Sequence, residues 1–332
     1  MLDQAISHKG QASNLPAQTG EDISSAFQAV IFDHPEYAYC PGVTLTYNGT
    51  TNIPYLTYDD NVFINKVNQV VQEITTALNG RDDDYSKVKA IFDYLTTHLE
   101  YDYGVYNRVS NAGQNDENAM IQALSSGGAS FSPYGALCLK KAVCEGIART
   151  FKLFCDLFNV ACRCVKCYQR NQDGSRGDGH MNNLVTIEGV DSFVDVTFAL
   201  PHTEFPIVLY QFFLTDLTTM NKYVIFDEEN IQGYRSRHNY FVKHSCSFHT
   251  LDKLRPYLRA YDARYFHQQI LFEYDGDETK EEKMRDFTLE ILNHHLPPGR
   301  QWIGSYSHGY FLGLLVDSHQ MKKLQQAQKS KE

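Results

Sequence analysis

The stretch AVCEGIARTFKLFCDLF, residues 142–158, decides which fold and which chemistry this sequence predicts. Its apolar positions recur at helical spacing, so it predicts a buried helix that begins at or near Cys144. The free amides and the dipole of a helix N-terminus favour a thiolate, which makes Cys144 a candidate nucleophile. The small residues Ala142, Gly146 and Ala148 would let a substrate backbone approach the sulfur. A lone cysteine in an amphipathic helix is, however, more often an inert core residue.

A β-hairpin is predicted after this helix. The segments 180–187 and 192–198 alternate apolar and polar residues, and Glu188-Gly189 separates them. A turn of this kind pairs residue 187 with residue 190. We therefore expect an antiparallel sheet packed against the helix.

The same register brings three reactive side-chain types together. Asp195 lies opposite Asn182 and diagonal to His180, a spacing that long side chains can span. A carboxylate in an apolar strand is costly to bury without a partner. An imidazole that bonds a carboxylate through one nitrogen keeps the other for proton exchange with a thiol. Cys144, His180 and Asp195 can therefore serve as nucleophile, base and orienting carboxylate. The plain alternative for His180 is a solvent-exposed strand start.

The remaining segments complete an α+β fold class. Two further helices are predicted at residues 60–80 and 86–99, with Asp60 and Ser86 as their N-caps. A strand, a helix and a strand near the end of the chain predict a small β-α-β module, and no internal repeat is present.

We expect the chain to divide into four parts. They are residues 1–20 as a disordered or loosely ordered N-terminus, 21–230 as the core with its lead-in, 231–320 as a small α+β module, and 321–332 as a flexible tail.

Charge and composition exclude several classes of protein. The 332 residues carry a formal net charge of −10, and no basic patch stands out, which disfavours nucleic acid and anionic lipid surfaces as partners. The sequence has no run of about 18 apolar residues that could span a bilayer. The opening residues lack a basic stretch followed by an apolar one, so we expect no secretory leader. Six of the eight cysteines lie between residues 138 and 167, which indicates a reducing, cytoplasmic compartment rather than a disulfide framework.

Four segments together resemble the transglutaminase-like superfamily, most closely its bacterial branch, whose fold is related to the papain-like cysteine proteases. They are KVKAIFDYLTTHLEYDY at residues 87–103, SPYGALCLKKAVCEGIARTFKLFCDL at 132–157, HMNNLVTI at 180–187 and FVDVTF at 193–198. The resemblance implies a papain-like core with the nucleophile at a helix N-terminus.

The resemblance also implies a chemistry. It identifies Cys144 as the nucleophile, His180 as the general base and Asp195 as the carboxylate that orients His180. The expected reaction is acyl transfer from a protein or peptide amide through a thioester, to a primary amine or to water, with no metal or other cofactor. Asn182 stands where the family commonly has Trp, which predicts a wetter site, whereas Asn183 matches the family's usual Asn and is a candidate contact to substrate. Tyr134 is a candidate second donor to the oxyanion, with ordinary aromatic packing as the alternative.

Two other interpretations stay open at this stage. Cys162, Cys164 and Cys167 could hold a metal, but alternation along a strand puts Cys167 on the face opposite the other two. The chain could also be a non-catalytic transglutaminase-like binding or scaffold module, whose abundant aromatic side chains would line a groove for a partner.

Overall fold

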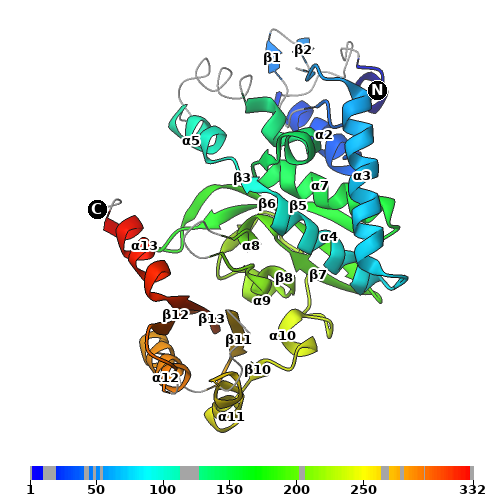
Figure 1. Cartoon of the computed structure of the whole chain (residues 1–332). Helices are drawn as coiled ribbons and strands as arrows, with labels where there is room; N and C mark the ends of the chain where they lie inside the picture. Colours follow the sequence, from blue (N-terminus) through cyan, green and yellow to red (C-terminus); the bar gives the residue numbers. More distant parts are fainter. Residues whose placement is uncertain are drawn as a thin grey trace. The chain divides into compact units, whose positions relative to one another are not determined.

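The fold is that of a computed structural model, which describes residues 2–9, 20–40, 45–47, 50–52, 55–112, 127–201, 206–262, 269–276, 280–294 and 296–329. The chain forms two compact units. The first unit comprises Met1–Leu200 and Phe212–Ser236, and the second comprises Pro201–Gln211 and Arg237–Glu332. Helices and mainly antiparallel sheets make up both units, so the predicted α+β class is confirmed (Figure 1).

The first unit is built on a five-stranded sheet in the order β8-β7-β6-β5-β9. Every neighbouring pair in it is antiparallel, as the hairpin pattern predicts. Its strands are β5 (Cys162–Arg170), β6 (Arg176–Ile187), β7 (Val190–Val194), β8 (Phe213–Thr215) and β9 (Val224–Phe226). Short pairs outside this sheet are β1 (Leu45–Tyr47) with β2 (Thr50–Asn52), and β3 (Glu100–Tyr101) with β4 (Lys141–Ala142).

The turn between β6 and β7 fixes the register of the hairpin. Glu188 and Gly189 both have positive φ, 53° and 76°, as a type I′ turn requires. Ile187 therefore pairs with Val190, which is the predicted register.

Helix α7 (Cys144–Leu157) packs against β5 and β6, and Figure 1 shows it lying along the sheet. The other elements of this unit are α1 (Leu2–Ser7), α2 (Gly20–Asp33), α3 (Asp60–Leu78), α4 (Asp84–His98), α5 (Tyr103–Ala112), η1 (Gly128–Phe131), η2 (Gly135–Leu139), α8 (Val196–Ala199) and α9 (Leu217–Met220).

The N-caps of two helices lie earlier in the chain than the sequence indicates. Asp59, rather than Asp60, accepts from the first turn of α3, and Asp83, rather than Ser86, caps α4. In both places a run of acidic residues offers several capping carboxylates, and the side chain that reaches an amide of the first turn takes the role.

The two ends of the chain differ from the expected loose segments. Leu2–Ser7 is helical, and Ile6 is fully buried in a cluster with Phe27 and Ile31, so an apolar contact orders residues expected to be unordered. The expected flexible tail from residue 321 lies instead in helix α13 (Ser318–Lys329). Residues 1, 10–19 and 330–332 of these segments lie outside the described part.

The second unit has its own four-stranded sheet, in the order β10-β11-β13-β12. The predicted β-α-β elements are present as β11, α12 and β13, while β12 was not predicted and pairs along the whole length of β13. The elements are η3 (Tyr210–Phe212, whose last residue belongs to the first unit), α10 (Tyr240–Lys243), β10 (Ser247–Phe248), α11 (Leu251–Asp262), β11 (Gln269–Tyr274), α12 (Glu281–Asn293), β12 (Arg300–Ser307), β13 (Tyr310–Asp317) and α13. Trp302, the protein's single tryptophan, is buried in this unit's core.

Among the described helices, none combines the length and apolar character needed to cross a membrane.

Candidate active site

Cys144 is the first residue of α7, as the sequence predicts. The N-cap residue, Val143, is extended and offers no side-chain acceptor to the first turn, so the first amides of the helix are not taken up by a side-chain cap. The Cys144 side chain is half-buried. A thiolate or a developing oxyanion at this position therefore meets the positive end of the helix.

The small residues around Cys144 serve a purpose that the sequence did not suggest. Ala142 and Ala148 are buried, and a Cβ on Gly146 would lie 2.4 Å from the carbonyl oxygen of Ser130. These positions let neighbouring backbone pack closely under the helix, and the expectation that they also let a substrate approach the sulfur stays a prediction.

His180 and Asp195 meet in the core. Nε2 of His180 lies 2.6 Å from Oδ2 of Asp195, and the two side chains are 1% and 0% exposed. His180 is therefore not a solvent-exposed strand start, and the predicted diagonal contact is present. Because the carboxylate holds Nε2, Nδ1 is the ring nitrogen left to exchange a proton.

The surroundings of His180 favour its charged form. Burial alone lowers the pKa of His180, but the charge and hydrogen bond of Asp195, and then the interaction with the Cys144 side chain, raise that pKa to about 10. The structure therefore brings His180 and Asp195 into contact, and the interaction of Cys144 with His180 adds to the rise of this pKa. A neutral-pH imidazolium beside the thiol is the charge arrangement that stabilises a thiolate.

Strand β7 ends just before Asp195, earlier than the alternation in the sequence predicts. Strand β7 stops at Val194, and the carboxylate Oδ1 of Asp195 accepts from the backbone N–H of Phe198 at 2.9 Å, capping α8. The prediction of a continuous strand over 192–198 was therefore wrong, because capping by Asp195 turns the chain into a helical turn. This turn places the ring of Phe198 flat on His180, with centroids 4.2 Å apart.

The ring of Phe198 covers one face of the imidazole. At Asn182, where the related family commonly has Trp, the side chain is buried and its Nδ2 lies 3.7 Å from Sγ of Cys167. The absence of a ring at position 182 therefore does not leave His180 open to solvent.

Asn183 lies in the core rather than on a substrate-facing surface. It is 1% exposed, and its Nδ2 donates to the carbonyl oxygen of Ala148 at 3.0 Å. This hydrogen bond ties β6, which carries His180, to α7, which carries Cys144. A contact to substrate would need this amide to be exposed, so the geometry gives Asn183 a positioning role.

Tyr134 makes aromatic contacts. Its ring stacks on Tyr58 with a centroid distance of 4.1 Å and lies 6.4 Å from the ring of Phe63. These contacts are those of the packing alternative, and its role as an oxyanion donor stays a prediction.

Arg149 is a buried charge near the site that the sequence did not reveal. The guanidinium of Arg149 is fully buried and donates to the carbonyl oxygens of Tyr37, Cys40 and Phe131 at 2.9–3.1 Å. It also lies 3.6 Å from a carboxylate oxygen of Glu145, one helical turn earlier. The i, i+4 spacing of this pair was visible in the sequence, but its burial was not.

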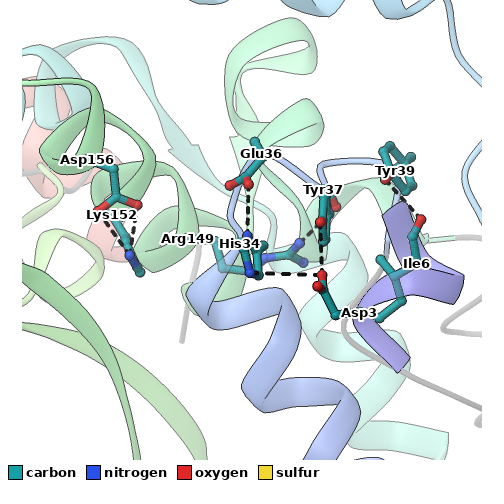
Figure 2. A network of polar contacts seen from close by, with 9 residues as sticks. All are labelled: Asp3, Ile6, His34, Glu36, Tyr37, Tyr39, Arg149, Lys152 and Asp156. Carbon is teal, nitrogen blue, oxygen red and sulfur yellow. Dashed lines mark hydrogen bonds and ion pairs between the residues drawn. The ribbon is translucent and has the colours of Figure 1, made fainter. Parts of the chain in front are cut away.

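Figure 2 shows the polar network around Arg149. The segment that carries Tyr37 and Tyr39 accepts a hydrogen bond from Arg149, and its tyrosine hydroxyls continue the network to α1 by donating to Asp3 and to the carbonyl oxygen of Ile6, each bond 3.0 Å long. Arg149 thereby links the N-terminal lead-in to the helix that presents Cys144.

The cysteine-rich strand offers no cation site. Asn183 reaches Cys162 and Cys164, whereas Cys167 contacts Asn182 and the carbonyl oxygen of His180, so the three thiols lie on the two faces that alternation predicts. Within the described ranges, no group of three or more His, Cys, Asp or Glu side chains is arranged to hold a metal ion.

Residues 69–196 match the family model of the transglutaminase-like superfamily. This segment is a transglutaminase-like domain, and Cys144, His180 and Asp195 all lie within it. No curated protein matches the sequence.

Solved structures add three distant likenesses. A structure described as a TGase is 17% identical, covers 50% of this chain and 47% of its own, and has a TM-score of 0.32. A candidate cysteine protease from Cytophaga hutchinsonii is 17% identical, covers 46% of both chains and has a TM-score of 0.27. A candidate protease from Parabacteroides distasonis is 10% identical, covers 84% of this chain and 55% of its own, and has a TM-score of 0.26. The chain spans about half the length of these structures, and likenesses this distant say nothing of its activity.

Proposed function

We propose that this protein is a thiol-dependent acyl-transfer enzyme that acts on protein or peptide amides through a thioester on Cys144. The observation that supports the proposal is the buried contact of His180 with Asp195, combined with the position of the half-buried Cys144 at the N-terminus of α7 and its interaction with His180. A histidine with a purely structural role needs only one hydrogen-bond partner. Here the imidazole has a carboxylate at one nitrogen and a thiol beside it, which is the arrangement of nucleophilic catalysis.

In the first half-reaction, the Cys144 sulfur attacks the amide carbonyl. An S–C bond forms, and the negative charge passes to the carbonyl oxygen. The C–N bond then breaks, and the leaving amine or ammonia takes its proton from His180. Asp195 keeps the ring oriented and stabilises its charge throughout.

In the second half-reaction, a nucleophile attacks the thioester. His180 removes a proton from that nucleophile, and the S–C bond breaks so that the sulfur leaves as a thiolate beside the recharged imidazolium. A primary amine gives a cross-link, whereas water gives deamidation or proteolysis. The choice depends on how well the cleft excludes water.

Intact-mass measurement of an accumulated acyl-enzyme tests this proposal. The protein is incubated with a glutamine-containing protein digest, quenched in acid and mapped for adducts, with Cys144→Ser as the matched control. We expect hydroxylamine-sensitive acyl adducts on Cys144 alone. A fluorescent primary amine added in parallel separates the outcomes, because incorporation indicates transfer and ammonia or peptide release indicates hydrolysis.

A non-catalytic binding module is the competing function. It predicts no adduct, no amine incorporation and no release, and it also predicts that Cys144→Ala retains full biological function. That combination of results would overturn the enzyme proposal.

A further inference from the structure

The proposed chemistry requires a second hydrogen-bond donor near Cys144. A tetrahedral intermediate carries its charge on the former carbonyl oxygen, and catalytic sites commonly offer that oxygen two donors. The backbone N–H of Cys144, in the free first turn of α7, is one of them. The following inference rests on the proposed function and concerns the other donor.

Tyr101 lies beside the strand that leads into Cys144. Strand β3 pairs in parallel with β4, and the register places Tyr101 opposite Ala142, two residues before the nucleophile. The backbone N–H of Asp102 donates to the carbonyl oxygen of Ala142 at 3.0 Å, which continues this pairing toward the site. The position of Tyr101 is therefore fixed by the same short ladder that positions the start of α7.

The residue after Tyr101 is anchored on both of its carboxylate oxygens. Asp102 accepts from the hydroxyl of Ser130 at 2.6 Å and from the backbone N–H of Val105 at 3.0 Å. This anchoring matters because an oxyanion donor must hold its position before the charge develops.

The ring of Tyr101 is packed against other tyrosines. It lies edge-on to the rings of Tyr103 and Tyr106, with centroids 4.9 and 5.9 Å away. The Tyr101 hydroxyl has no hydrogen-bond partner among the described residues, and the residue is neither fully buried nor exposed. A phenol whose ring is packed, and whose hydroxyl bonds to no other described residue, can donate to a substrate.

The other tyrosines near the site either make contacts with other residues or are exposed. The hydroxyl of Tyr106 donates to Asp178 at 2.6 Å, and the ring of Tyr134 is stacked on Tyr58. Tyr103 is 57% exposed. Tyr101 is therefore the candidate that combines proximity, anchoring and a free donor.

We propose that the Tyr101 hydroxyl is a catalytic residue that donates a hydrogen bond to the oxyanion formed when Cys144 attacks an acyl carbon. Tyr101, rather than Tyr134, is then the side-chain donor that the reaction needs.

The protonation state of Tyr101 is compatible with this role. Burial, followed by the interaction with Cys144, raises the pKa of Tyr101 well above its ordinary value. The phenol therefore keeps its proton at neutral pH.

Two probes of Cys144 separate oxyanion stabilisation from thiol activation. p-Nitrophenyl acetate acetylates the thiol: an S–C bond forms, the C–O bond to p-nitrophenolate breaks, and a tetrahedral oxyanion lies between them. Iodoacetamide alkylates the same sulfur by displacing iodide and forms no oxyanion. We expect Tyr101→Phe to slow acetylation of Cys144 by at least about tenfold, toward the roughly 10²-fold typical of a lost oxyanion donor. The iodoacetamide rate should stay within about twofold, which also shows that the variant is folded.

The control is Tyr103→Phe, which removes a hydroxyl from the neighbouring exposed ring and should leave both rates unchanged. Equal loss of both rates in Tyr101→Phe, or no loss in either, would overturn the inference, as would loss of acetylation in Tyr134→Phe alone. In each of these cases the wild-type protein still reacts at Cys144, so the proposed function survives. A wild-type protein whose Cys144 reacts with neither probe would instead remove the proposed function and this inference with it.

Discussion

Two charged pairs lie near Cys144, and they are built differently. In the pair of His180 with Asp195, the separation is 2.6 Å, and the second carboxylate oxygen of Asp195 is satisfied by the amide of Phe198. In the pair of Arg149 with Glu145, the separation is 3.6 Å, and Oε1 of Glu145 and Nε of Arg149 have no hydrogen-bond partner within the part of the chain that the structure describes.

This difference indicates that the two pairs have different roles. Because the first pair is compact and fully hydrogen-bonded, it holds an imidazole in one orientation beside a thiol. The pair of Arg149 with Glu145 is more widely separated. The Arg149 guanidinium also donates hydrogen bonds to three backbone carbonyl oxygens of distant segments. We therefore assign the first pair to chemistry and the second to holding the lead-in segment on α7.

The largest effect should come from neutralising the carboxylate of the first pair. Asp195→Asn keeps an acceptor for the amide of Phe198 but removes the charge that orients and stabilises the His180 imidazolium. We expect the rate of Cys144 acylation to fall by about 10³–10⁴-fold, the size of loss seen when a triad carboxylate is replaced by its amide.

Asp216→Asn is the matched control for this change. Asp216 caps α9 through the amide of Thr219, as Asp195 caps α8, but it faces no histidine of the site. Similar losses in the two variants would mean that helix capping, rather than the histidine contact, explains the role of Asp195.

The pair of Arg149 with Glu145 should affect mainly the stability of the first unit. Arg149→Met removes one partner of a buried pair and leaves the carboxylate of Glu145 uncompensated, so we expect the first unit to lose about 3–5 kcal/mol of its free energy of unfolding. Trp302 lies in the second unit and does not report on this change, so amide hydrogen exchange over α7 is the suitable measurement.

Lys152→Met is the control on the same helix. Lys152 pairs with the half-exposed Asp156 at 2.8 Å, and the loss of such a pair should cost no more than about 1 kcal/mol. The double variant Arg149→Met with Glu145→Gln sharpens the comparison, because it removes both charges and should regain part of the loss. Equal destabilisation by Arg149→Met and Lys152→Met would contradict the assignment.

A smaller effect should appear in the pH dependence of stability. Burial raises the pKa of Glu145 from 4.5 to about 7, although Arg149 and Lys166 oppose that rise. The folded chain therefore holds an extra proton between these two pH values, and the free energy of unfolding should fall as pH rises through that window, by up to about 3 kcal/mol. Glu145→Gln should flatten this slope in hydrogen exchange over α7, whereas Glu282→Gln on the exposed surface of α12 should leave it unchanged. An unchanged slope in Glu145→Gln would show that its carboxyl titrates normally.

The features that follow local rules could be predicted from sequence. Glu188-Gly189 fixed the hairpin register, and helical periodicity placed Cys144 at a helix start, because turn chemistry and amphipathic spacing act over a few residues. The end of β7 was not predicted because the Asp195 carboxylate both contacts His180 and caps α8. In a strand pattern, a capping carboxylate cannot be told from any other polar residue.

The features that depend on tertiary packing could not be predicted. The sequence singled out Tyr134 but not Tyr101, because only the pairing of β3 with β4 brings residue 101 beside residue 142. Arg149 was overlooked for the same reason, since its three acceptors lie as far away as Tyr37 in the sequence. The reactive residue types were recognisable, while the residues that position them were not.

The most direct test of the central claim is the rate at which iodoacetamide modifies Cys144 as a function of pH, in wild-type protein and in His180→Ala. His180 carries its charge up to a pKa of about 10, so at about pH 7 the wild-type thiol should react on the order of tenfold faster than the variant thiol. The two rates should converge as the pH approaches about 10, where His180 loses its proton and a free thiol is already ionised. Equal rates at neutral pH, or a Cys144 that reacts no faster than the other cysteines, would contradict the account.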